Sequence, residues 1–168
     1  MNNSNFYNII RFLVLVLLQV LIFNHINFLG YINPYPYILF VLLFPVNNNR
    51  TLFILASFFV GLTIDLFSDS GGVHAASCAF IAYLRPPVLK FCFGMLYEHH
   101  TMKFSNTDFS NKSIYFLILT VFHHLMLFTM EIFSLSNILL ILKKTLFTSI
   151  FTLVLCIFIS ILFSNRQR

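Results

Sequence analysis

The sequence predicts an all-α protein that crosses a membrane several times as a helix bundle. Of its 168 residues, 59% are hydrophobic and 9% are charged, whereas roughly a quarter of an ordinary soluble domain is charged. The long runs of Leu, Ile, Phe and Val would leave large apolar patches in water, and six such runs are separated by turns or polar residues. We therefore expect a single transmembrane domain over residues 1–168, with about six transmembrane helices surrounded by lipid bilayer.

The first two predicted helices differ in length. The first, 9–29, is too long for the apolar region of a signal peptide and no A-x-A cleavage site follows it, so we expect it to remain as a membrane anchor. The second, 37–46, is short because Pro36 and Pro45 bracket it. Neighbouring helices and polar loops must share the span with this short helix.

The third and fourth predicted helices are joined by a tight turn. The third covers 51–67 and ends at a Ser/Asp/Gly cluster, 68–72, whose residue types favour turn geometry. The fourth covers 73–97 and is expected to kink at 86–87, where two prolines adjoin, with 88–97 lying along the membrane interface as the alternative. Its first half is rich in Ala, Ser and Cys, and small residues let helix backbones approach closely in a bilayer. We expect this helix at the centre of the bundle.

The last two predicted helices cover 113–133 and 146–163. The stretch 98–112 before them is a polar loop with no visible domain in it, and 134–145 lies between the two helices. Six spans place both termini on the same side of the membrane.

The lysines and arginines select that side. They lie singly or in small groups at the edges of apolar runs and form no basic stripe, so the net charge of +5 does not indicate a nucleic-acid partner. With a cytoplasmic N-terminus, eight of the ten fall inside and two outside, as the positive-inside rule favours. The inner set is Arg11, Arg50, Arg85, Lys90, Lys103, Lys112, Arg166 and Arg168, and the outer pair is Lys143 and Lys144. Both termini are therefore expected in the cytoplasm.

Asp65 is the acidic residue most in need of an explanation within the apolar segments. It lies about 21 Å along the third helix at 1.5 Å per residue, near the outer boundary of the bilayer. Gly61 precedes it by one helical turn, so both lie on one face, where the glycine permits a close helix contact. The N-terminus of the fourth helix, at 72–74, attracts an anion. We interpret Asp65 as a structural clamp on the outer turn, with a proton or ion relay as the alternative.

Paired histidines raise the possibility of a metal site, but their spacing argues against one. Adjacent histidines on a helix point about 100° apart, and the HExxH pattern is absent. We expect His123 or His124 to face the bundle and bond a neighbouring helix. The candidate ligands considered are His99, His100, His123, His124, Glu98 and Glu131.

No pattern in the sequence indicates catalysis. GxSxG, Walker, Rossmann and EF-hand motifs are absent. Cys78, Cys92 and Cys156 lie far apart within apolar segments and are expected to be small buried hydrophobic residues. We therefore expect no catalytic residues, no cofactor and no metal.

One stretch carries a family resemblance. Residues 61–67 read Gly-Leu-Thr-Ile-Asp-Leu-Phe, a glycine-containing turn follows, and the next helix is rich in small residues and contains Ala-Tyr. This pattern, together with the apolar first helix and the proline-opened second one, resembles the MreD family of bacterial rod-shape-determining membrane proteins. The resemblance implies a structural or partner-binding role for Gly61, Asp65, Gly71, Gly72, Ala82 and Tyr83.

The resemblance also implies a function. It predicts a non-catalytic scaffold in the bacterial inner membrane, part of the cell-elongation machinery that builds peptidoglycan. Its direct partner would be the bitopic protein MreC, which links it indirectly to the MreB filament and to peptidoglycan synthases.

Two other functions remain as alternatives. MreD-type folds also look like the substrate-binding subunits of vitamin transporters, so the first alternative is binding or transport of a small molecule. An intramembrane enzyme is the second, and it would need a metal or nucleophile cluster that the spacing does not offer. The transport alternative predicts an enclosed polar cavity lined by residues such as Gln19, Asn24, Asp65, His123 and Glu131.

Overall fold

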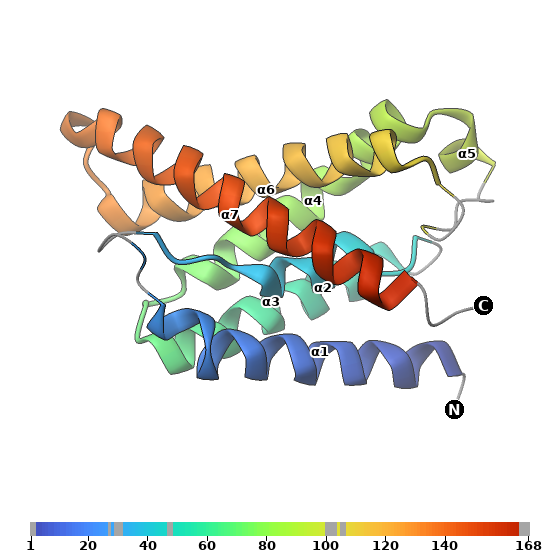
Figure 1. The fold of residues 1–168 in the computed structure, drawn as a ribbon, viewed down its shortest axis with the longest axis horizontal. Helices are drawn as coiled ribbons and strands as arrows, with labels where there is room; N and C mark the ends of the chain where they lie inside the picture. The colour runs from blue at the N-terminus through green and yellow to red at the C-terminus, as the bar shows by residue number, and fades with distance from the viewer. Residues whose placement is uncertain are drawn as a thin grey trace.

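The computed structural model describes residues 3–26, 28, 32–46, 49–99, 104 and 107–164. Over these residues the chain is all-helical and contains no strand (Figure 1). Within these described ranges, four stretches are long and apolar enough to cross a membrane, and they are Asn8–His25, Arg50–Ser68, Phe109–Ile132 and Ile138–Leu162. The expected class, an all-α membrane protein, is confirmed at this level.

The helices follow one another along the chain with short connections. Those of at least one α-helical turn are α1 (Asn3–Leu21), α2 (Leu39–Leu43), α3 (Arg50–Ser68), α4 (Val73–Phe93), α5 (Met95–Glu98), α6 (Phe109–Ile132) and α7 (Ile138–Ser164). In the described part of the chain, 3₁₀ turns lie at helix ends, namely η1 (Phe23–His25), η2 (Pro36–Ile38) and η4 (Leu135–Asn137). The chain thus reverses direction within a few residues at most connections.

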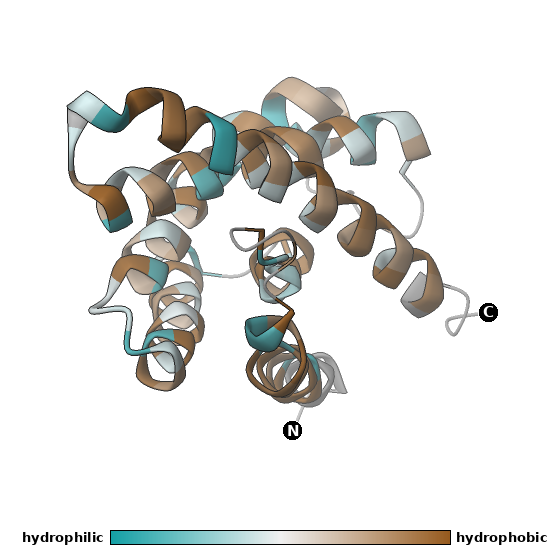
Figure 2. Ribbon diagram, turned by 60° about the vertical axis from the view of Figure 1, so that its left-hand side comes forward, coloured by the Kyte–Doolittle hydropathy of each residue, from teal (hydrophilic) through white to brown (hydrophobic). Residues whose placement is uncertain are grey.

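The long helices lie roughly along one axis (Figure 1). α3 packs on α4, α4 on α6, and α6 on α7, whereas α1 contacts α3 and the segment that contains η2 and α2. α4 is less apolar than α3, α6 and α7 and has a neighbour on each side. The start of α1 and the end of α7 lie at the same end of the bundle (Figure 1). Much of the ribbon is hydrophobic, as expected for helices that face lipid (Figure 2).

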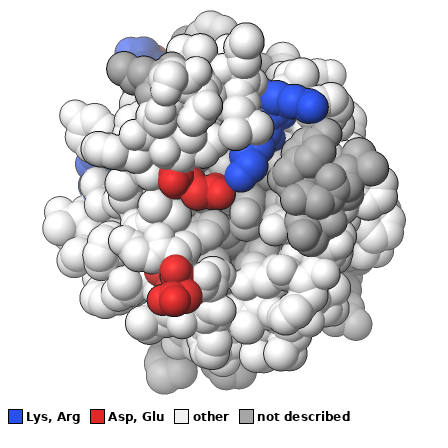
Figure 3. All heavy atoms as spheres, turned by 90° about the vertical axis from the view of Figure 1, so that its left-hand side faces the viewer, with Lys and Arg blue, Asp and Glu red and all other residues white. Residues whose placement is uncertain are grey.

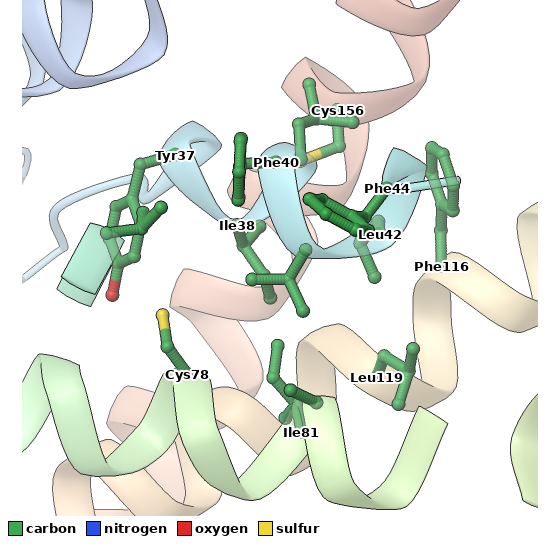
Figure 4. Close-up of a cluster of buried hydrophobic side chains, with 14 of the residues drawn as sticks. Tyr37, Ile38, Phe40, Leu42, Phe44, Cys78, Ile81, Phe116, Leu119 and Cys156 are labelled. Atoms are coloured by element: carbon green, nitrogen blue, oxygen red, sulfur yellow. The ribbon is translucent and has the colours of Figure 1, made fainter. Parts of the chain in front are cut away.

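A short segment, 32–44, runs through the middle of the bundle and joins α1 to α3. It begins as extended backbone, continues through η2 and α2, and buries Tyr37, Ile38 and Leu42 completely. Ile38 and Leu42 lie among side chains of α4, α6 and α7 (Figure 4). Extended backbone advances about 3.3 Å per residue and a helix only 1.5 Å. A segment that is partly non-helical therefore passes through the bundle with fewer residues than a continuous helix would need. Non-helical backbone is tolerated at membrane depth because protein encloses it.

Helix α4 differs at its C-terminal end from the expected helix 73–97. It ends at Phe93, because Gly94 leaves helical geometry with a φ of 48°, and the next four residues form the separate helix α5. Pro86 and Pro87 lie inside α4, which continues through them. The predicted 73–97 boundary is therefore wrong, and the chain turns at the glycine.

Helix α7 begins earlier than the sequence suggested. The last helix is expected to start at 146, but α7 starts at Ile138 and includes both Lys143 and Lys144. The apolar run 138–142 continues the helix, and Lys144 Nζ binds Glu131 Oε1 at 3.0 Å across the α6–α7 turn. The other expected helices deviate less, except that α1 ends at Leu21 rather than near residue 29.

Candidate functional site

The carboxylate of Asp65 holds the N-terminus of α4. It accepts hydrogen bonds from the backbone N–H groups of His74 (3.0 Å) and Ala75 (2.8 Å), and from the hydroxyl of Ser70 (2.5 Å). The first N–H groups of a helix have no partner within the helix, and the helix dipole favours a negative charge there. Asp65 is 5% exposed. The contact predicted between this acid and the start of the fourth helix is present.

Gly61 lies one turn before Asp65 on the same face of α3 and directly contacts the α4 backbone. A methyl group on Gly61 would lie 2.5 Å from Ala75 Cα and 2.6 Å from Ala75 N, and it would also meet the carbonyl oxygen of His74. Side-chain carbons essentially never approach backbone atoms so closely. Glycine is therefore required here for space, as expected from the sequence.

The turn between α3 and α4 depends on backbone conformation rather than on space. Asp69, Gly71 and Gly72 have φ angles of 50°, 68° and 96°. An added Cβ on Gly71 or Gly72 would meet nothing within 4 Å, so these glycines serve the left-handed geometry that other residues adopt at a cost. The turn directs the start of α4 onto the Asp65 carboxylate.

The predicted Ala82–Tyr83 pair is divided between two environments. Ala82 is fully buried in the core beside α2, α3 and α6. Tyr83 is 61% exposed, and the guanidinium carbon of Arg50 lies 5.1 Å from the centre of its ring. Packing within the described chain therefore explains Ala82 but not Tyr83.

A buried polar network lies behind the Asp65 turn. The hydroxyl of Tyr37 is 2.8 Å from His74 Nδ1 and 3.0 Å from His123 Nε2. A hydroxyl both donates and accepts, so Tyr37 can donate to one imidazole and accept from the other. Cys78 Sγ lies 3.9 Å from the same nitrogen of His123. The central segment, α4 and α6 are thus joined at one point.

The neighbouring histidine, His124, faces α7. Its Nδ1 lies 2.8 Å from the carbonyl oxygen of Thr120 and 3.2 Å from Ser149 Oγ, and its Nε2 lies 3.4 Å from Thr152 Oγ1. Thr152 also accepts a hydrogen bond from the backbone N–H of Tyr35, at 3.0 Å. Both His123 and His124 are fully buried, which confirms that they face the bundle and contact neighbouring segments.

Replacement of Tyr37 by phenylalanine is expected to destabilise the bundle without changing its shape. The variant keeps the ring but removes the hydroxyl that His74 and His123 share, and an unsatisfied buried polar group costs about 1–3 kcal/mol. We expect a lower midpoint of thermal unfolding in detergent, measured by circular dichroism. Tyr97→Phe, in α5, is the matched control and should unfold as the wild type does. Equal midpoints for all three proteins would contradict the role given to this hydroxyl.

Arg85 binds the free carbonyl groups at the C-terminus of α2, just as Asp65 binds the free N–H groups at the N-terminus of α4. Its guanidinium donates to the carbonyl oxygens of Leu42 and Phe44 and, at 2.8 Å, to the hydroxyl of Tyr115. Arg11 donates to the carbonyl oxygen of Leu43 at 3.0 Å. The last carbonyls of a helix lack partners and favour a positive charge. The sequence indicated Arg85 only as a topology signal at a helix edge, whereas it is 3% exposed.

A pocket of about 610 Å³ opens at the end of the bundle that holds the α3–α4 turn. Figure 3 views this end, where a few charged side chains interrupt an otherwise uncharged surface. Of the five residues proposed for an enclosed polar cavity, Asn24 and Glu131 line the pocket, whereas Gln19, Asp65 and His123 are buried among other side chains. The other lining residues are Val20, His25, Asn33, Tyr35, Phe67, Ser68, Ser70, Val73, His74 and Met130.

No group of three or more His, Cys, Asp and Glu side chains suited to a metal ion occurs among the residues whose structure is described. His100, Lys103, Arg166 and Arg168 lie outside the described residues. Cys78 and Cys156 are buried and Cys92 is half-buried, as unpaired thiols. Comparison with family models, with curated proteins and with solved structures found no match to this chain.

Proposed function

We propose that this chain is a non-catalytic scaffold subunit of the bacterial cell-elongation machinery, in the inner membrane. In this proposal it spans the membrane six times, by α1, the segment 32–44, α3, α4, α6 and α7, with both termini in the cytoplasm. Its direct partner is a bitopic protein of the MreC type, through which it connects to the MreB filament and to peptidoglycan synthases.

The observation that carries the proposal is the junction of α3 and α4. The residues of the family-like pattern build a packing contact, in which Gly61 gives the space and Asp65 gives the hydrogen bonds. A scaffold needs a rigid arrangement of helix faces, and the junction supplies it. The acidic residue most suggestive of chemistry has its carboxylate occupied by three donors.

The distribution of charge supports the proposed orientation. Arg50 is the first residue of α3, Lys90 lies near the end of α4, and Lys112 lies near the start of α6, whereas Arg11 lies about halfway along α1. The start of α3, the end of α4 and the start of α6 lie at the end of the bundle where α1 begins (Figure 1). Positive side chains flanking spans concentrate on the cytoplasmic side, so this end is the proposed cytoplasmic one.

Tyr83 is the residue through which the partner contact is best tested. It belongs to the family-like pattern and is 61% exposed, and its ring lies 5.1 Å from the guanidinium carbon of Arg50. Tyrosines near the centre of an interface contribute strongly to affinity. We expect Tyr83→Ala to reduce co-purification of the MreC-type partner from native membranes about tenfold, with no change in thermal unfolding and with rounding of rod-shaped cells.

The control for this experiment is Phe91→Ala, on the same helix and 78% exposed. It removes an aromatic ring of similar size from outside the family-like pattern, so partner recovery should match the wild type. Recovered proteins are identified by mass. Wild-type membranes that yield no component of the elongation machinery would refute the proposed function.

A second function, binding of a small molecule, is favoured by the 610 Å³ pocket, since ligand pockets span roughly 300–1,000 Å³. Glu131 and His74 give it polar groups beside the apolar Val20 and Met130. Extraction and mass analysis of molecules retained by the purified protein test this function, with Met130→Trp as a variant that narrows the pocket. A stoichiometric compound lost in Met130→Trp would support binding. If the wild-type protein retains no compound but does recover its partner, only the scaffold function is supported.

A further inference from the structure

A second cavity, of about 200 Å³, lies at the opposite end of the bundle from the α3–α4 turn. It is enclosed by the residues before α3, the first turns of α3, the second half of α4, and α5. Its lining residues are Pro45, Val46, Arg50, Phe53, Arg85, Pro86, Leu89 and Tyr97. Two of these are arginines and none is acidic.

Arg85 brings a buried positive charge to this cavity without an acidic partner. All five Asp and Glu residues of the chain are described, and none forms an ion pair with Arg85. Its guanidinium carbon instead lies 4.7 Å from the ring centre of Phe53 and 5.8 Å from that of Phe104. Carbonyl dipoles and aromatic faces compensate a charge only in part, and a buried charge is costly unless it is paired.

Arg50 adds a second positive charge at the rim. It is the first residue of α3, so the positive end of that helix dipole also points toward this region. Arg50 is exposed. Glu98, the acidic residue of α5, does not line the cavity and accepts a hydrogen bond from Lys90 at 2.8 Å, which lowers the pKa of Glu98. The electrostatic potential of the cavity is therefore positive.

We propose that this cavity binds the phosphate group of an anionic ligand, either a phospholipid headgroup or free phosphate. Arginine presents planar N–H groups that match phosphate oxygens, and basic pockets between membrane helices bind anionic headgroups. The volume exceeds the space of a single water and falls below the range for drug-sized ligands, which suits a headgroup. Phe53 and Leu89 give it an apolar wall. The proposal requires membrane insertion but not the scaffold function.

The test uses the full-length protein in a zwitterionic detergent, examined by native mass spectrometry while phosphatidylglycerol is added. A second series adds inorganic phosphate alone. Arg50→Gln removes the rim charge without touching the buried contacts of Arg85, and it should weaken lipid retention about tenfold, because charge-assisted hydrogen bonds are the stronger class. Lys90→Gln is the matched control, since it removes a charge at the same end of the bundle but outside the cavity lining.

Each outcome decides the proposal. Retention of phosphatidylglycerol by the wild type and Lys90→Gln, with loss in Arg50→Gln, supports a lipid headgroup. Binding of inorganic phosphate with the same dependence on Arg50, and no advantage for the lipid, supports a soluble phosphate source. Equal retention by all three proteins, or equal loss in both variants, overturns the site. Circular dichroism of Arg50→Gln separates loss of binding from loss of folding.

Discussion

Replacement of Gly61 by alanine is expected to remove most of the folded protein. The added methyl would lie 2.5 Å from Ala75 Cα and 2.6 Å from Ala75 N, and both are backbone atoms that cannot rotate away. Overpacking a well-packed interior costs about 1–3 kcal/mol, and more where the backbone must shift. Because α3, α4 and α6 pack in sequence, separation of the first pair loosens the whole bundle. The measurement is the yield of monodisperse protein in detergent and its thermal midpoint.

Gly94→Ala is the control for the Gly61 substitution. Gly94 has a φ of 48°, but an added Cβ would meet nothing within 4 Å. Its substitution adds only backbone strain, about 1–3 kcal/mol, and displaces no neighbouring backbone, so it should reduce stability less than Gly61→Ala. A Gly61→Ala protein as stable as the Gly94→Ala protein would show that the α3–α4 contact is not tight.

Replacement of Asp65 by asparagine is the second change expected to have a large effect. Asparagine keeps the shape but removes the charge and replaces one acceptor oxygen with an NH₂ group, which donates and does not accept. Asparagine therefore cannot accept from the N–H groups of both His74 and Ala75, which bond different oxygens of Asp65. Hydrogen bonds to a charged group contribute about 1.5–3 kcal/mol each, so we expect a loss of about 2–4 kcal/mol. Thermal unfolding in detergent, followed by circular dichroism, measures it.

Asp69→Asn provides the same chemical change four residues later in the same turn. Asp69 is exposed and has positive φ, a conformation that asparagine tolerates, so this variant should unfold as the wild type does. Ser70→Ala removes only one of the three donors and should fall between the two. An Asp65→Asn protein with wild-type stability would eliminate the clamp and with it the main support for the scaffold function.

The sequence predicted the α3–α4 junction because its partners are neighbours along the chain. Asp65 is nine residues from His74 and ten from Ala75, so a helix, a turn and a second helix place them together with little freedom. The spacing of Gly61 and Asp65 gave their common face directly. Short-range geometry of this kind follows from helix periodicity alone.

The remainder of the polar interior depends on contacts that are distant in sequence. Tyr37 meets His123 across 86 residues and Arg85 meets Phe44 across 41. No periodicity in the sequence indicates which buried groups will meet over such separations. An arginine at a helix edge can be a topology signal or can cap a helix end, and the sequence does not distinguish the two roles. The structure shows that Arg85 is a buried cap, whereas Arg50 is exposed.

The segment 32–44 has a consequence for how the protein enters the membrane. Its short helix and extended backbone leave peptide groups that lipid cannot satisfy, so it cannot remain in the bilayer as an independent insert. Arg11 and Gln19 of α1 donate to two of its carbonyl oxygens. Its other polar contacts come from later in the chain, from Arg85 in α4, Tyr115 in α6 and Thr152 in α7. Although it is synthesised before α3, this segment is therefore among the last parts of the bundle to complete its polar contacts.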